Sequence, residues 1–293
     1  MENMLRNRKT ILCFLLPGLI VYLLSVVVPI IWSIGYSLVD WRGYGAMEFV
    51  GLGNFKEMMT DSEFWMSVWH TLIYTFWEVI LQVGGGLLLA LLLTQVPVGR
   101  RIFQLLYYLP VIISTVALCQ MFRKIFAVVP AGLFNQLLSL INPEWIALEW
   151  LTNVKTSLMM VTLTTGYKNM AIYMVVFYAA FLTIPASLLE AARIDGAGAF
   201  RTFFSIKLPH IRPTLIANMV LVLNGSLRGY DIARLLTAGG PINSSQLQAM
   251  YMYKQAFSSQ RYGYGSAIAI FIVAEALVFA YLFRKFTSRW NEE

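Results

Sequence analysis

Long apolar runs separated by short charged stretches dominate this chain of 293 residues. A helix needs about 20 mostly apolar residues to cross the hydrocarbon core of a bilayer. Runs of that kind occupy residues 11–39, 65–95, 102–122, 156–185, 213–236 and 264–284. The pattern predicts an all-α membrane protein in which six transmembrane helices form a single domain over residues 1–293.

Two apolar stretches need separate interpretation. The first run is too long for the core of a signal peptide, and no small-residue cleavage site closes it, so we expect a retained anchor. Residues 125–142 are apolar but short, and a seventh crossing would place the basic residues of 193–212 outside. We therefore expect 125–142 to form an amphipathic element on the outer surface.

Composition supports the membrane class. The chain is 58% hydrophobic and 13% charged, against about 25% charged for a typical soluble domain. The net charge of +7 comes from basic residues scattered in twos and threes between apolar runs, which fits topology signals better than a nucleic-acid-binding face. Cys13 and Cys119 both lie in apolar runs and indicate small buried hydrophobes.

The basic residues also predict the orientation, because cytoplasmic loops carry an excess of lysine and arginine. With the N-terminus inside, the cytoplasmic segments hold twelve basic residues: Arg6, Arg8, Lys9, Arg100, Arg101, Arg193, Arg201, Lys207, Arg212, Arg284, Lys285 and Arg289. The longer outer segments hold seven: Arg42, Lys56, Arg123, Lys124, Lys155, Lys254 and Arg261. The predicted topology is N-in and C-in.

One cytoplasmic stretch, EAARIDGAGAFRTFFSIKLP at residues 190–209, is rich in small and polar residues although it lies between two apolar runs. Ser187 stands three residues before Glu190, the spacing of a capping box that begins a helix. Gly196 and Gly198 interrupt that helix, and a second short helix with three phenylalanines is expected before Pro209 stops it. Aromatic side chains on such a loop need a partner, either the bilayer surface or another protein, so we interpret it as a docking element.

The stretch resembles the EAA loop of binding-protein-dependent ABC importer permeases, and most closely that of the carbohydrate importers. The matching positions are Glu190, Ala191, Ala192, Gly196, Ile206, Leu208 and Pro209. Four other segments resemble the same subfamily: residues 49–65, 167–185, 230–241 and 263–270. The resemblance runs from about residue 10 to 285 and is closest to the first of two permeases, the maltose- and glycerol-phosphate-type partner.

The resemblance implies that loop 187–213, between the fourth and fifth helices, is a cytoplasmic coupling helix that docks on an ATPase. Its coupling residues would be Glu190, Ala191, Ala192, Asp195, Gly196, Phe200 and Pro209. The implied partners are a second, non-identical permease, two ABC ATPase subunits and an extracellular or periplasmic substrate-binding protein, in a bacterial or archaeal cytoplasmic membrane. The alternative for the loop is an ordinary capped segment lying on the membrane surface.

The chain carries no Walker-type glycine-rich lysine motif, so ATP and Mg²⁺ would bind the partner ATPase and no cofactor is expected on this chain. The sequence also shows no pairing of a nucleophile with a general base, so it does not indicate an enzyme. His70 and His210 stand alone, without companions at metal-ligand spacing, and no metal is expected.

Polar residues within the fourth and fifth apolar runs indicate a substrate pathway, because ionisable groups at membrane depth are costly. Asn224, Arg228 and Asp231 have helical spacing and are expected to share one face. The resemblance places substrate contacts on the same two helices, so the predicted pathway residues are Lys168, Asn169, Tyr173, Asn224, Ser226, Arg228, Tyr230 and Asp231. The alternatives are that Arg228 pairs with Asp231 and that Lys168 extends to the outer surface.

Glu78 and Gln82, one turn apart in the second run, and Glu275 in the sixth are also expected at membrane depth. For these we favour hydrogen-bonded interhelical groups over substrate contacts.

The predicted function is import of a carbohydrate, with an oligosaccharide favoured. The alternatives are glycerol-3-phosphate or another anionic or uronate-bearing solute, which Lys168 and Arg228 would suit. A self-sufficient channel or ion-coupled carrier would be expected to show internal repeats and no ATPase-docking loop.

Overall fold

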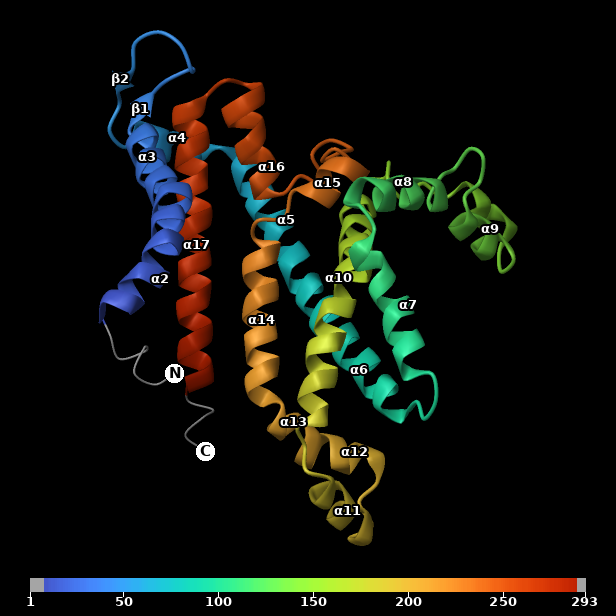
Figure 1. The fold of residues 1–293 in the computed structure, drawn as a ribbon. Coiled ribbons are helices and arrows are strands. Elements are labelled where there is room, and N and C mark those ends of the chain that lie inside the picture. The colour runs from blue at the N-terminus through green and yellow to red at the C-terminus, as the bar shows by residue number, and fades with distance from the viewer. Residues whose placement is uncertain (1–7, 289–293) are drawn as a thin grey trace. The chain divides into compact units, whose positions relative to one another are not determined.

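The computed structural model describes residues 8–288, and they are overwhelmingly helical (Figure 1). The chain divides into two compact units, one of residues 1–64 with 251–274 and one of residues 65–250 with 275–293. The helices α5 (Ser62–Glu78) and α17 (Tyr262–Ser288) each pass from one unit into the other.

Three helical stretches are long and apolar enough to cross a membrane unaided: Phe14–Ser37, Ser62–Gln95 and Tyr262–Phe283. Three pairs of helices, each bent at a short break, also pass this test together. If each pair is one span, the described residues contain six candidate spans. The pairs are Arg100–Ile112 with Thr115–Ile125, Ser157–Leu182 with Ala186–Ile194, and Ala199–His210 with Arg212–Ser226. Each of these six segments overlaps one of the apolar runs identified above. No described helix within residues 125–142 is long and apolar enough to cross a membrane.

The first unit contains a helical N-terminal stretch, a two-stranded ribbon and the segments packed with them. Its elements are α2 (Arg8–Tyr22), the π-helical η1 (Leu23–Val27), α3 (Val28–Ser37), β1 (Val39–Asp40), β2 (Glu48–Phe49), α4 (Gly53–Thr60), the second half of α16 (Gln248–Tyr253), the π-helical η5 (Lys254–Ser258) and the first half of α17. The strands are antiparallel, with Val39 opposite Phe49.

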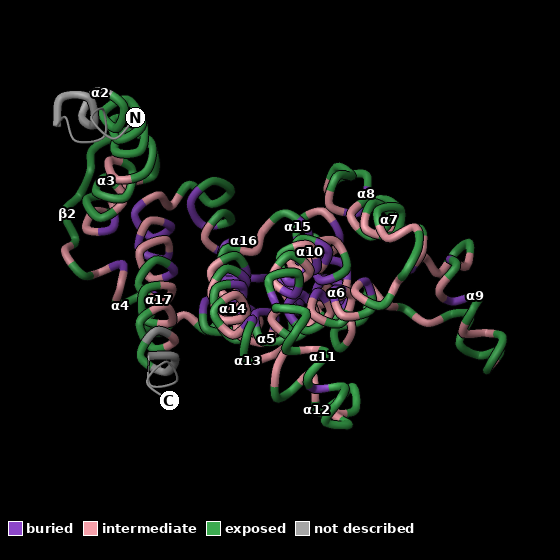
Figure 2. The backbone as a smooth tube through the Cα atoms, turned by 60° about the horizontal axis from the view of Figure 1, so that its bottom comes forward, coloured by how far each residue is buried: buried purple, intermediate pink, exposed green. Residues whose placement is uncertain are grey.

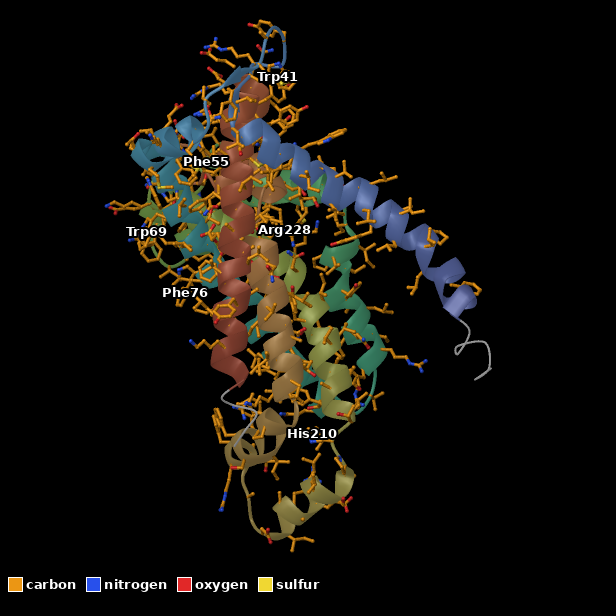
Figure 3. The ribbon with its side chains drawn as sticks, turned by 90° about the vertical axis from the view of Figure 1, so that its left-hand side faces the viewer. Trp41, Phe55, Trp69, Phe76, His210 and Arg228 are labelled. Atoms are coloured by element: carbon orange, nitrogen blue, oxygen red, sulfur yellow. The ribbon has the colours of Figure 1, made fainter. Side chains whose placement is uncertain are left out.

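Side-chain contacts hold this unit together. Asn54 donates hydrogen bonds of 2.9 and 3.0 Å to the carbonyls of Ser37 and Val39, which ties α4 to the end of α3. The ring of Trp41, labelled in Figure 3, stacks on Tyr36 with 5.2 Å between centroids. Arg261 forms an ion pair of 2.6 Å with Glu57, which joins the start of α17 to α4.

The second unit is built around α10 (Ser157–Leu182). Its other elements are the π-helical η2 (Val79–Gly84), α6 (Gly85–Gln95), α7 (Arg100–Ile112), α8 (Thr115–Ile125), α9 (Leu133–Ser139), the 3₁₀ turn η3 (Pro143–Ala147), α11 (Ala186–Ile194), α12 (Ala199–Thr202), the π-helical η4 (Phe203–Lys207), α13 (Leu208–His210), α14 (Arg212–Ser226) and α15 (Asp231–Leu236).

The core of this unit lies where α10 packs against α6, η2 and α14 (Figure 2). Gly86 and Gly166 permit the closest approaches. A Cβ at Gly86 would lie 2.8 Å from Cβ of Tyr173, and one at Gly166 would lie 2.8 Å from Cβ of Leu81. Small residues let membrane helices approach closely and gain dispersion contacts. A larger side chain at either glycine would therefore separate α10 from its neighbours.

The structure corrects three local expectations. The helix expected over 102–122 bends by 96° between α7 and α8, and the one expected over 213–236 ends at Ser226 and resumes at Asp231. Asn224, Arg228 and Asp231 therefore share no continuous helical face. The expected capping box was also wrong, because α11 begins at Ala186 with Pro185 at its N-cap and makes no side-chain capping bond. The proline sets the helix start one residue before Ser187.

Candidate functional site

The loop between α10 and α14 folds as two short helices joined by a tight turn. At the end of α11, the N–H of Ala197 donates to the carbonyl of Ala192 (2.9 Å) and that of Gly196 donates to Arg193 (3.1 Å). This pair of bonds is the Schellman motif, whose closing residue adopts a left-handed conformation. Gly196 occupies that position with φ of +70°. Glycine suits this position because residues with a Cβ rarely adopt the left-handed conformation.

The predicted coupling residues present most of their surface on this loop. Glu190, Ala191, Asp195, Gly196, Phe200 and Pro209 are exposed, and Ala192 is buried. Ile194 and Phe200 are 85% and 83% exposed. Two large apolar side chains so fully exposed beside carboxylates form a surface suited to protein contact. Whether an ATPase binds there stays a prediction.

The two ends of the loop are held close to each other. The Oγ1 of Thr183, after α10, lies 3.4 Å from Nε2 of His210, before α14. The ammonium group of Lys207 lies 5.9 Å from the ring centre of Phe181 on α10. Figure 3 shows His210 at the end of α14 opposite to the end that carries Arg228. These contacts link the end of α10 to the segment that precedes α14.

A polar cavity of about 260 Å³ lies at the opposite end of α14, where the chain breaks before α15. Its wall includes five of the predicted pathway residues: Lys168, Asn169, Arg228, Tyr230 and Asp231. Lys168 lies eleven residues into α10, about 17 Å along the helix axis at 1.5 Å per residue. The whole helix of 26 residues is about 39 Å long, so the cavity lies against the middle of α10.

The charged groups of the cavity are not paired with one another. Lys168 does not extend to the surface, because its Nζ donates to Oγ1 of Thr115 at the start of α8. Arg228 is exposed, and its Nε donates to the carbonyl of Asn224 at 3.1 Å. No ion pair joins Arg228 to Asp231 in the described part of the chain. The cavity thus offers two cations, one carboxylate, an amide and phenol rings to a ligand.

Three predicted pathway residues do not line this cavity. Tyr173 packs against Gly86, the Asn224 amide donates to its own helix at the carbonyl of Val220, and Ser226 is buried with its hydroxyl bonded to Val222. The structure adds Tyr74, Thr115 and Thr165 to the wall. None of these three stood out in the sequence, because hydroxyl-bearing side chains are common in apolar runs and their elements are distant along the chain.

Gly229 explains how Tyr74 reaches the cavity. A Cβ at this position would lie 2.9 Å from a ring carbon of Tyr74 and 3.0 Å from the carbonyl oxygen of Ser226. Real Cβ atoms do not approach that closely, so a larger residue would push the tyrosine ring or the α14–α15 turn away.

The other intramembrane acids lie outside the cavity. Glu78 is fully buried and accepts a 2.5 Å hydrogen bond from Nε2 of Gln82. Glu275 accepts a 2.9 Å bond from Nε2 of the buried Gln248. The Glu275 bond joins α17 to α16, as expected for an interhelical group, whereas the Glu78 bond stays within the segment formed by α5 and η2.

Residues 82–292 match the family described as the binding-protein-dependent transport system inner membrane component. The chain belongs to this family. The family assignment agrees with the resemblance found in the loop at residues 190–209, and it makes the chain a membrane permease subunit rather than an enzyme.

Two curated relatives illustrate the family. The chain is 31% identical over 283 residues to a probable ABC transporter permease, YurN, of Bacillus subtilis, with 96% of each chain covered. It is 30% identical over 257 residues to AmyD, a probable permease for starch degradation products of Thermoanaerobacterium thermosulfurigenes, covering 88% of this chain and 86% of the relative.

The fold also matches a solved structure. A chain of a bacterial ABC transporter involved in import of the acidic polysaccharide alginate superposes with a TM-score of 0.82, covering 98% of both chains at 23% identity. The two chains therefore share their fold.

Proposed function

We propose that this chain is one of two permease subunits of an ATP-driven importer for an oligosaccharide, with six spans and both termini in the cytoplasm. The polar cavity at the α14–α15 break is the observation that carries the proposal. Amide, charged and aromatic groups around a pocket hold hydroxyl-rich ligands and orient them. The starch-product relative supports a carbohydrate substrate.

The coupling follows from the connection between loop and cavity. The helices α10 and α14 both line the cavity and both end at the loop of residues 183–211. A movement of the loop driven by a docked ATPase would be carried about 20 Å along α10 from Leu182 to Lys168. A packed helix transmits such a displacement because its core neighbours cannot be compressed.

A second, non-identical permease is part of the proposal. The cavity exposes Arg228 and Asp231, and lipid cannot satisfy charged groups at mid-depth. A facing permease would enclose the pathway and supply the missing wall. Expression of this chain alone should give little stable protein and no uptake. Co-expression with the second permease should restore both. A stable, transport-competent homodimer would contradict the heterodimer.

The substrate class is tested by uptake into proteoliposomes that hold the assembled importer with its binding protein and ATPases. We expect uptake of labelled oligosaccharides and sugar-stimulated ATP hydrolysis. Glycerol-3-phosphate serves as the competing solute. Preferential uptake of glycerol-3-phosphate would refute the carbohydrate assignment while leaving the permease assignment intact.

A further inference from the structure

The helix α5 and its continuation η2 present two faces of different chemistry. Ser67, Thr71, Glu78 and Gln82 follow one stripe and are all at most 5% exposed. The opposite stripe carries Trp69, Ile73, Trp77 and Leu81 at intervals of four residues, with Trp69 62% and Trp77 50% exposed. The polar stripe faces the protein interior, and the aromatic stripe faces outward. Trp69 stands at the edge of the ribbon in Figure 3.

The aromatic stripe forms one wall of a groove of about 450 Å³ within the second unit. The other wall comes from α10, through Leu158, Met159 and Leu163. Polar groups occur in the lining at His70, Lys155, Thr162 and Ser244. The groove is separate from the polar cavity, because the two linings share no residue.

The depth of the groove corresponds to one leaflet. His70 and Leu81 are eleven residues apart on a helical segment, which is about 16 Å along its axis. The hydrocarbon core of a bilayer is roughly 30 Å thick, so one leaflet contributes about 15 Å. Trp69 near one end has the chemistry of an interfacial anchor. Assignment to the outer leaflet rests on the topology proposed above.

Lys155 is the one charged residue among the described residues that line the groove. Lys155 is exposed, lies just before the start of α10 and forms no ion pair among the described residues. Thr156, the N-cap of this 26-residue helix, makes no side-chain capping bond. The N-terminus of a helix carries a partial positive charge and binds phosphate groups. The side chain of Lys155 and the N-terminus of α10 therefore lie at the same end of the groove.

We propose that this groove binds an anionic phospholipid of the outer leaflet. One acyl chain would lie between the α5 stripe and α10, and the phosphate would lie against Lys155 and the first turn of α10. A transmembrane helix of a second protein would extend past mid-depth, whereas the groove ends near Leu81 and Leu163. The single-leaflet depth and the cationic rim favour lipid.

The charge requirement is tested on the intact importer complex by native mass spectrometry after incubation with phosphatidylglycerol or phosphatidylcholine. We expect preferential retention of phosphatidylglycerol. Lys155→Glu should reduce that retention at least fivefold, since about 1 kcal/mol is gained per cation near an anionic lipid surface. Lys56→Glu, at an exposed lysine of α4 that does not line the groove, is the matched control and should change little.

The groove itself is tested by filling it. Leu163→Trp should lower retention of both lipids, whereas Leu88→Trp, at a 58% exposed position outside the groove, should not. Both variants are checked for complex yield. A photoactivatable phosphatidylglycerol on the unmodified complex should label segments 69–81 and 154–163, independently of any variant.

Two results would overturn the proposal. Equal retention of the two lipids, insensitive to Lys155→Glu, would remove the anionic site. A photoreactive side chain at position 77 that cross-links to the second permease and not to lipid would identify the groove as a subunit contact instead.

Discussion

Glu78 shows how this protein accommodates an acid inside its membrane domain. Its carboxylate is fully buried, one oxygen accepts the amide of Gln82, and the other has no hydrogen-bond partner. The pair lies where α5 passes into the π-helical segment η2, which packs against both α10 and α14. π-Helical turns often occur at functional sites. The pair is thus placed to maintain the geometry of the helices that line the cavity.

Glu78→Gln should preserve thermal stability and uptake, because the new amide oxygen still accepts from Gln82 and no ionisable group is needed for that bond. Glu78→Ala should destabilise the protein by about 1–3 kcal/mol, since the Gln82 amide is left buried without a partner. Thermal unfolding of the detergent-solubilised complex measures the difference. Equal loss in both variants would show that the carboxylic acid itself is required.

Asp61 is a second acid with unusually many partners, this time outside the spans. Its carboxylate accepts hydrogen bonds from the hydroxyls of Tyr251 and Tyr264 and from the backbone N–H groups of Glu63 and Phe64. Burial of the carboxylate opposes its ionisation, but these hydrogen bonds outweigh it and lower the pKa of Asp61 below the ordinary value of 3.8. The ionised form is therefore the one that stabilises the first unit.

A lowered pKa contributes stability above its unfolded value, and the contribution is lost as pH falls through the folded value. Thermal stability of the complex should therefore hold from neutral pH to about pH 4 and fall below it. Asp61→Asn should lower stability at pH 7 by about 1.5–3 kcal/mol and flatten the acid decline. Asp40→Asn, at an exposed acid of the same unit, is the control. An unchanged acid profile in Asp61→Asn would contradict this role.

At the scale of elements, the loop between α10 and α14 depends on the turn at Gly196. The Schellman motif ends α11 there and redirects the chain into α12. A Cβ at Gly196 or Gly198 would meet no atom within 4 Å, so space does not distinguish the two positions. The two positions differ in backbone conformation, because only Gly196 has a positive φ, of +70°.

Gly196→Ala should impair coupling, because a residue with a Cβ loses about 1–2 kcal/mol in the left-handed conformation. We expect about tenfold weaker ATPase docking from a penalty of that size. Gly198→Ala, whose φ of −67° suits any residue, should behave like the wild type. Co-purification of the ATPase and sugar-stimulated hydrolysis measure the effect. Normal coupling in Gly196→Ala would contradict the docking role of the loop.

At the scale of the whole membrane domain, the cavity is a product of several distant segments. α5, α8, α10, the α14–α15 turn and Leu247 all contribute to its wall. Arg228 projects from the turn without a carboxylate partner, whereas Lys168 is bonded to Thr115 and joins α10 to α8. The two cations therefore differ in their contacts: Arg228 bonds only to the backbone of its own turn, whereas Lys168 links two elements of the wall.

Arg228→Ala should raise the substrate concentration for half-maximal uptake about tenfold or more, the loss expected for a hydrogen bond to a charged group. Because Arg228 and Asp231 are unpaired, Arg228→Ala with Asp231→Ala should stay as impaired as the single variant. Lys168→Ala should reduce the yield of folded complex more than its substrate affinity. Uptake assays with complex yield measured alongside decide this, and recovery in the double variant would show that the two charges pair.

The sequence by itself determined the class of this protein and the character of its loop. Apolar length is a local property that can be compared directly with the thickness of the bilayer, so the candidate membrane segments could be located from their residues. The spacing of Glu190, Gly196 and Pro209 is likewise local. Only the tertiary structure decided where helices break, at Ile113–Ser114 and Leu227–Tyr230, and which polar groups meet. Tyr74 and Thr115 joined the cavity, and Tyr173, Asn224 and Ser226 did not. The reason is physical: contact between residues far apart in the chain depends on how helices pack and bend, and helical spacing predicts neighbours only while one helix continues.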